Sequence, residues 1–190
     1  MLSSGNILSG VKRINIVGTT GSGKSAFSKK LSRISGIPYV QIDQIYWGAD
    51  WYEPTDEEFF PKLREALNRE QWILDGNYGR TVPIKWKDVQ VVIWLDYPFP
   101  LVFYRAVKRA ITRAISKEEL WPGTGNKESF RRSFLSRDSI LGWTIKTYSG
   151  NRTRYLAAMR DTRFSHIQFV RLKSSEEALV FLEELEKANA

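Results

Sequence analysis

The sequence predicts a three-layer α/β fold, in which a five-stranded and mainly parallel sheet lies between two layers of helices. Short segments rich in Val, Ile and aromatic residues alternate along the chain with segments of helical periodicity. The motif GTTGSGKS, residues 18–25, follows the first apolar segment and opens a helical one. It is a complete phosphate-binding loop, in which a glycine-rich turn and a helix start aim backbone N–H groups at one point.

The elements of this fold can be placed from their patterns. Strands are expected at 13–17, 38–42, 71–74, 89–95 and 166–172. The fourth is almost continuously apolar, as expected of a central strand buried on both faces. Helices are expected at 24–35, 56–69, 100–116 and 176–187, with two or more between 128 and 160. Thr55 with Glu58, and Ser174 with Glu177, have the capping-box spacing that starts a helix.

Length and composition indicate one soluble domain over residues 1–190. The chain is 42% apolar and has no linker or repeat that would divide it. It contains no cysteine, which excludes a disulfide framework and a thiolate metal site. No long apolar run suggests a signal segment or a membrane span, so we expect a cytoplasmic protein without a membrane partner.

The positive charge of the chain is unevenly distributed. The formal net charge is +8, and residues 101–163 hold 14 Lys or Arg against 5 Asp or Glu, whereas the rest holds 15 against 16. A basic block of this kind serves nucleic acid, a membrane surface or an anionic small substrate.

The phosphate loop defines the first set of candidate residues. Those expected to bind nucleotide phosphates are Gly18, Thr19, Thr20, Gly21, Ser22, Gly23, Lys24 and Ser25. Lys24 adds a mobile charge for the outer phosphates. The Ser25 hydroxyl can complete a Mg²⁺ shell, and Asp96, which follows the apolar fourth strand, is expected to hold the metal beside it.

Two more strands end near an aspartate, and parallel sheets bind ligands at this edge. Asp43 follows the second strand and precedes Tyr46, Trp47 and Trp51, which could line an acceptor pocket. We expect Asp43 to accept a hydrogen bond or a proton from an acceptor hydroxyl. Asp75, which follows the third strand, and Arg80 are also expected at the acceptor, where Arg80 suits bidentate contact with an anionic part.

The helix after Asp96 carries the start of the basic block. Arg105, Arg109 and Arg113 are spaced by four and so share one face. The spacing predicts an apolar stripe on the opposite face, made of Phe103, Val107, Ala110 and Ala114. A connector rich in glycine follows, and Arg131 and Arg132 begin the next helical stretch.

Four motifs together resemble a known group. IDQIYW, WILDGNYGR, VIWLDYP and LGWTIKTYSGNRTRY are similar to segments of the bacterial P-loop proteins called DNA topology modulation proteins, which resemble adenylate kinases. The resemblance covers roughly residues 13–160 and implies a P-loop kinase fold that uses ATP and Mg²⁺. It also implies a small helical lid at about 116–132, with Arg131 and Arg132 on the phosphates and Arg109 and Arg113 in phosphoryl transfer. Lys173 would lie where related kinases hold adenine.

The acceptor stays open among nucleosides, nucleotides and other hydroxyl metabolites. The chain lacks the Thr-Gly-Asp element of adenylate kinases, which disfavours AMP. A GTPase is disfavoured because 126–129, NKES, lacks the acid of NKxD, and a mechanical ATPase because Tyr97 replaces a second acid after Asp96.

Two other functions remain as alternatives. One is an ATP-dependent nucleic-acid regulator, because aromatic and basic residues alternate in the motif WTIKTYSGNRTRY. They are Trp143, Lys146, Tyr148, Arg152, Arg154 and Tyr155. The other is a nucleotide-binding protein without turnover.

Overall fold

A computed structural model describes residues 4–128 and 140–189, and it contains a five-stranded sheet in the order β2-β3-β1-β4-β5. The strands are β1 (Arg13–Gly18), β2 (Tyr39–Gln41), β3 (Trp72–Asp75), β4 (Val91–Leu95) and β5 (Gln168–Leu172). Every neighbouring pair is parallel. The five predicted strands are therefore confirmed, and the sheet is parallel throughout.

Eight α-helices surround the sheet in the described part of the chain. They are α1 (Ser4–Leu8), α2 (Lys24–Ser35), α3 (Ile42–Tyr46), α4 (Asp56–Leu67), α5 (Val82–Lys85), α6 (Phe99–Ser116), α7 (Ile140–Ala158) and α8 (Ser175–Ala188). Short 3-10 turns are η1 (Ala49–Trp51), η2 (Gly79–Thr81) and η4 (Thr162–Phe164). None of the helices that the structure describes has the length and apolar character needed to cross a membrane.

Both predicted helix starts are present, but their capping differs. Glu58 Oε2 accepts a hydrogen bond from the Thr55 N–H at 3.0 Å and completes the capping box of α4. At α8, Ser174 Oγ accepts from the Glu177 N–H at 3.0 Å. The Glu177 carboxylate reaches one residue further back, to the Lys173 N–H at 2.7 Å, so this box is only half formed.

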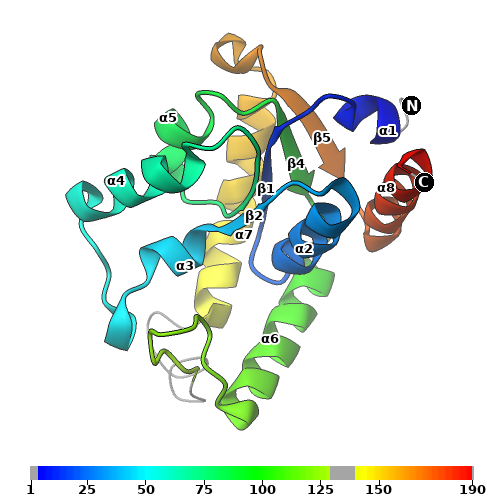
Figure 1. Cartoon of the computed structure of the whole chain (residues 1–190). Coiled ribbons are helices and arrows are strands. Elements are labelled where there is room, and N and C mark those ends of the chain that lie inside the picture. Colours follow the sequence, from blue (N-terminus) through cyan, green and yellow to red (C-terminus); the bar gives the residue numbers. More distant parts are fainter. Residues whose placement is uncertain (1–3, 129–139, 190) are drawn as a thin grey trace.

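Alternating strand residues feed two core layers, one on each side of the sheet. Ile14 and Ile16 pack with α1, α2 and α8, whereas Val17 packs with α3, α4 and α7. Figure 1 shows the same division, with α2 in front of the sheet and α7 behind it. Because helices cover both faces, a ligand can reach the central strands of the described sheet at their ends.

The arginines of α6 lie beside its buried side and not opposite an apolar stripe. The fully buried residues of this helix are Val102, Ala106 and Ala110, so the predicted stripe is wrong except at Ala110. Arg105, Arg109 and Arg113 each come three residues after one of them and are half-buried. Helical residues three apart are neighbours on the surface, so the arginines line the edge of the packed face.

The phosphate loop itself packs against α6. A Cβ atom built on Gly21 would lie 2.1 Å from the Val102 carbonyl oxygen, so the backbones touch where no side chain fits. Gly21 and Gly23 both have φ +85°, which disfavours other residues, but a Cβ atom on Gly23 would meet nothing within 4 Å.

This pair gives a matched test of the contact. We expect Gly21→Ala to lower the free energy of unfolding by about 3 kcal/mol, and Gly23→Ala by about 1 kcal/mol, because only the first adds a clash to the backbone strain. Urea unfolding of the two variants measures the difference. Equal losses would contradict the close packing of the loop on α6.

Candidate active site

The carboxyl ends of the five strands meet at one edge, and the phosphate loop leaves β1 there (Figure 1). β3 and β4 pair with β1 on its two sides. Asp75 ends β3, Asp96 follows β4, and Asp43 lies in α3 directly after β2. This edge therefore carries the loop and all three carboxylates.

Lys24 lies among charged groups of both signs. Its Nζ donates to the Thr19 carbonyl at 3.3 Å. Burial lowers the pKa of Lys24, while Asp75 and then Asp43 oppose that shift and Arg109 adds to it. The loop lysine, two strand-end carboxylates and an arginine of α6 thus share one electrostatic environment.

Asp75 is the carboxylate beside Ser25. Ser25 Oγ donates to Asp75 Oδ2 at 2.5 Å, and the Tyr39 hydroxyl donates to the same oxygen at 3.1 Å. The following residue, Gly76, has φ +152°, and a Cβ atom there would lie 1.9 Å from Ile42 Cγ2. This close approach brings the turn after β3 against α3, the helix that carries Asp43.

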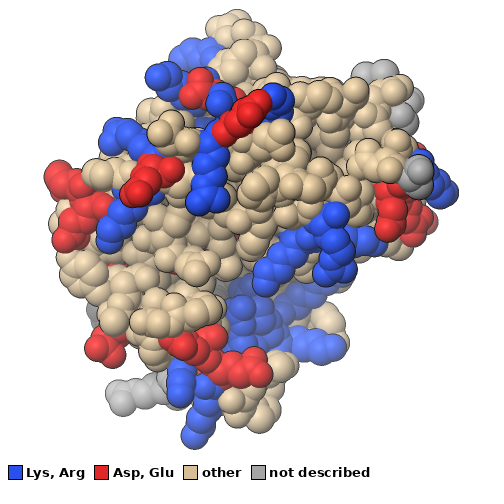
Figure 2. All heavy atoms as spheres, in the orientation of Figure 1, with Lys and Arg blue, Asp and Glu red and all other residues tan. Residues whose placement is uncertain are grey.

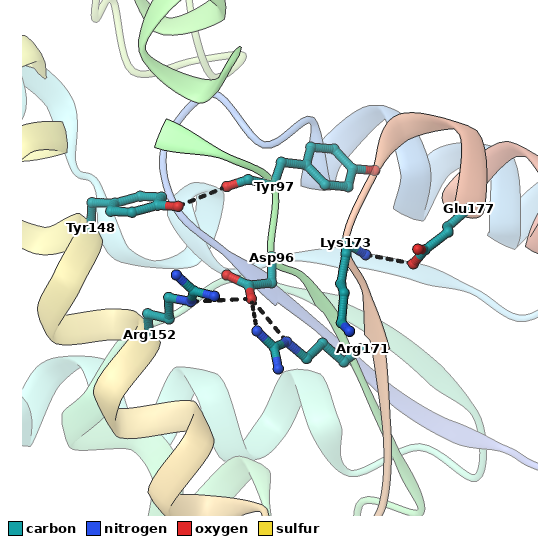
Figure 3. Close-up of polar contacts among 7 residues, drawn as sticks. All are labelled: Asp96, Tyr97, Tyr148, Arg152, Arg171, Lys173 and Glu177. Carbon is teal, nitrogen blue, oxygen red and sulfur yellow. Dashed lines mark hydrogen bonds and ion pairs between the residues drawn. The ribbon is translucent and has the colours of Figure 1, made fainter. Parts of the chain in front are cut away.

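The expectation that Asp96 lies beside Ser25 is corrected by its contacts (Figure 3). Asp96 Oδ2 accepts from Arg171 Nε at 2.8 Å and from Arg171 Nη2, and Arg152 Nε lies 3.4 Å from the same oxygen. The Arg171 guanidinium also lies over the Trp94 ring, 4.9 Å from its centroid. Two arginines direct this carboxylate toward β5 and α7, so we assign the place beside Ser25 to Asp75.

Asp43 has the environment of a carboxylate poised to take a proton. The Tyr78 hydroxyl donates to Asp43 Oδ1 at 2.9 Å. Burial raises the pKa of Asp43 and the Tyr78 hydrogen bond opposes the rise, while Asp75 adds to it and Lys24 and Arg109 oppose it. A carboxylate whose pKa is raised takes up a proton more readily than an ordinary aspartate.

Glu128, which the sequence analysis did not select, lies against the arginines of α6. Arg113 Nη1 lies 3.0 Å from Glu128 Oε1, and Glu128 is only 6% exposed. Burial lowers the pKa of Arg109 and Arg113 adds to that effect, whereas Glu128, Asp43 and Asp75 oppose it. In the sequence Glu128 follows a connector, and no periodic pattern there marked it as buried.

Arg80 is not brought together with Lys24, Asp43 and Arg109. Its Nη1 lies 2.9 Å from Asp56 Oδ1 at the start of α4, and its guanidinium lies over the rings of Tyr46 and Phe59, 5.2 and 5.7 Å from their centroids. A carboxylate and two aromatic faces therefore hold the guanidinium that was expected to bind the acceptor. Arg80 therefore lies beside Tyr46, one of the residues expected to line the acceptor pocket, and its contact with an acceptor stays a prediction.

Tyr46 and three tryptophans form an aromatic group after α3. Tyr46 is 7% exposed, its hydroxyl donates to Glu53 Oε2 at 3.2 Å, and its ring meets that of Trp47 edge-on. Trp121, from the loop after α6, stacks on Trp47 with centroids 6.0 Å apart and meets Trp51 edge-on. The segment after α3 and the loop after α6 thus meet through their indole rings.

Asn126 fixes the same two segments by hydrogen bonds. Its Oδ1 accepts from the Trp51 N–H at 2.7 Å, and its Nδ2 donates to the Gly48 carbonyl at 2.8 Å. Asn126 is 1% exposed, and Trp51 has φ +62°. The oxygen and the nitrogen of the Asn126 amide are both used in these bonds. The loop thereby holds η1 in a sparsely populated backbone conformation.

Of the three remaining predicted residues, the structure describes Lys173. Lys173 follows β5 at the same sheet edge, near Asp96 and Tyr97 in Figure 3, and its N–H binds Glu177. Arg131 and Arg132 lie outside the described residues. In Figure 2 many Lys and Arg side chains gather in the lower half of the face, where α6 lies in Figure 1.

The residues around Ser25 fit a magnesium ion. A hydroxyl oxygen and a carboxylate oxygen are hard donors of the kind that Mg²⁺ prefers, and the hydrogen bond between Ser25 and Asp75 makes these two oxygens neighbours.

Comparisons with known proteins bear on the fold. The sequence matches no protein-family model and no curated protein with which it was compared. It is similar in structure to a gluconokinase from Sinorhizobium meliloti 1021, with a TM-score of 0.50 and 13% identity, over 94% of this chain and 91% of that one. The fold is that of a P-loop kinase. Fold alone follows from this likeness, and the DNA topology modulation part of the sequence resemblance gains no support from it.

The contact between Tyr78 and Asp43 predicts a pKa change. We expect Tyr78→Phe to raise the pKa of Asp43 further, because the variant loses a hydrogen bond that favours the carboxylate. When the pH is lowered, any step that needs the ionised Asp43 carboxylate would then be lost at a higher pH in the variant than in the wild type. Carbon NMR of the Asp43 carboxyl group measures this shift.

Tyr39→Phe is the matched control, because the Tyr39 hydroxyl binds Asp75 and not Asp43. A pKa of Asp43 that is unchanged in Tyr78→Phe, or changed equally in the control, would contradict the assigned contact.

Proposed function

We propose that this protein is a kinase that transfers the γ-phosphoryl group of Mg–ATP to a hydroxyl group of a small acceptor. The observation that carries the proposal is the gathering of Lys24, Asp43, Asp75 and Arg109 within one electrostatic environment at the phosphate loop. Cations that neutralise a phosphoryl group, beside a carboxylate that can take a proton, are the parts that phosphoryl transfer requires.

Each residue has a role in the proposed reaction. The loop from Gly18 to Ser25 binds the phosphates, and Lys24, Arg109 and Arg113 offset the charge of the transferring group. The acceptor oxygen bonds to the γ-phosphorus, its proton passes to Asp43, and the bond from the γ-phosphorus to the β,γ-bridging oxygen breaks to release ADP. Ser25 and Asp75 would hold Mg²⁺, which supplies further charge neutralisation when bound.

The acceptor would enter between Asp43 and the aromatic group of Tyr46, Trp47, Trp51 and Trp121. The candidates are a nucleoside, a nucleotide or another hydroxyl metabolite, and Arg80, which lies over the Tyr46 ring, remains a proposed contact for an anionic part of the acceptor. Lys173 remains the proposed neighbour of the nucleotide base, and Arg131 and Arg132 remain proposed phosphate contacts. We expect the reaction in the cytoplasm, where Mg–ATP is the phosphoryl donor.

The packing of α7 argues against the alternative of a nucleic-acid regulator. Tyr155 is 2% exposed, and the half-buried Tyr148 meets Phe99 edge-on while its hydroxyl donates to the Tyr97 carbonyl at 3.1 Å. Rings that are packed inward cannot stack on bases. Arg152, on the same side of the helix, is paired with Asp96.

Phosphorus NMR of the protein with Mg–ATP and a pool of hydroxyl compounds tests the proposal. We expect a new phosphorylated species that forms only when the pool is present. Lys24→Ala should slow its formation about 100-fold or more, because a charge that stabilises the transferring group is lost. Lys30→Ala, which changes a lysine further along α2, should leave the rate unchanged.

Two results would overturn the proposal. Production of ADP and free phosphate alone, unaffected by the pool and raised by DNA, would move the assignment to the nucleic-acid alternative. ATP binding without any product would identify a nucleotide-binding protein without turnover.

A further inference from the structure

Asn77, a residue to which the proposed reaction assigns no role, holds the first residue of the phosphate loop by both of its backbone groups. Asn77 Oδ1 accepts from the Gly18 N–H at 2.9 Å, and Asn77 Nδ2 donates to the Gly18 carbonyl at 2.5 Å. The backbone ladder between β1 and β3 pairs Ile16 with Asp75, and the Gly76 N–H still donates to the Ile16 carbonyl. The Asn77 amide therefore continues this ladder with a side chain, at the point where β1 becomes the loop.

A buried lysine fixes the backbone of Asn77. Lys85 Nζ donates to the Asn77 carbonyl at 2.9 Å and to the Gly76 carbonyl at 3.1 Å. Lys85 has no exposed surface, and burial lowers its pKa to about 7, with Arg154 and Lys24 adding to the shift. A buried donor that satisfies two carbonyls pins the turn after Asp75 in place.

A helix far along the chain reaches the same asparagine. The Tyr155 hydroxyl of α7 donates to Asn77 Oδ1 at 3.0 Å, and Arg154 Nη2 donates to the Tyr155 oxygen at 3.2 Å. Asn77 Oδ1 thus accepts from the loop and from α7 at once. The asparagine is the point at which β1, the turn after β3 and α7 are joined.

We propose that Asn77 is a positioning residue of the phosphate loop, which fixes Gly18 and couples α7 to nucleotide binding. The proposal rests on the proposed function, because it takes the loop as the binding site for ATP phosphates. The amide supplies an acceptor for the Gly18 N–H and a donor for its carbonyl on two separate atoms, so both bonds form at once. An aspartate would repel that carbonyl and add negative charge beside the phosphates.

A double-mutant cycle on Mg–ATP affinity tests the coupling. In calorimetry we expect Asn77→Ala to weaken binding about 10-fold and Tyr155→Phe about 3-fold, since each removes hydrogen bonds that fix the loop. The double variant should bind about as weakly as Asn77→Ala alone, because the Tyr155 hydroxyl acts through Asn77. Asn77→Asp should bind more weakly than Asn77→Ala. Asn68→Ala, at an exposed position after α4, is the matched control and should keep the wild-type affinity.

Amide hydrogen exchange at Gly18 provides a readout that does not depend on nucleotide. We expect Asn77→Ala to speed exchange of the Gly18 N–H, since its acceptor is lost, while the urea midpoint shows that the variant is folded. Tyr155→Phe removes only the hydroxyl and keeps the ring, so this variant of the double-mutant cycle preserves the packing of the core. Faster exchange in a folded variant supports positioning even if wild-type protein does not bind Mg–ATP, a result that would overturn the proposed function alone.

Two outcomes would overturn the role of Asn77. One is Gly18 exchange and Mg–ATP affinity that are both unchanged in folded Asn77→Ala. The other is a double variant in which the effects of Asn77→Ala and Tyr155→Phe simply multiply, because independent effects would mean that Tyr155 does not act through Asn77.

Discussion

A single hydrogen bond, from Ser25 to Asp75, joins the helix that follows the phosphate loop to the strand beside it. It depends on the order of the sheet, in which β1 lies between β3 and β4 and so opens its loop between two strand ends. The loop has little freedom to move away, because Gly21 touches the backbone of α6 and Gly18 is held by Asn77. The positions of Lys24 and of the arginines on α6 follow from this packing.

Charge balance at the sheet edge is the second constraint. Burial raises the pKa of Asp43 and lowers those of Lys24 and Arg109, so each group alone would tend to lose its charge. Charges of opposite sign oppose that tendency at each group, and Glu128 balances Arg113 from the loop after α6. A polyphosphate would enter an environment in which the cations are already held in place and need little reorganisation.

Much of the fold could be predicted from the sequence because its signals are local. The helix at 24–35 was predicted with its observed bounds, since glycines flank it on both sides. The short helices α3 and α5 were not, because four or five residues show no helical period. The partners of Asp96 and Arg80 could not be predicted, since Arg171, Arg152 and Asp56 are brought there by strand order and packing. The burial of Glu128 and Lys85 could not be predicted either, because no periodic pattern in the sequence marks these charged residues as buried.

The magnesium dependence of ATP binding tests the central claim, that Asp75 and not Asp96 is the carboxylate that serves the loop. Calorimetry would compare ATP affinity with Mg²⁺ and with chelator in wild type, Asp75→Asn and Asp96→Asn, after urea unfolding has shown that each variant is folded. We expect Asp75→Asn to lose the gain in affinity that Mg²⁺ gives, and Asp96→Asn to keep it. Loss of the gain in Asp96→Asn and its retention in Asp75→Asn would contradict the account.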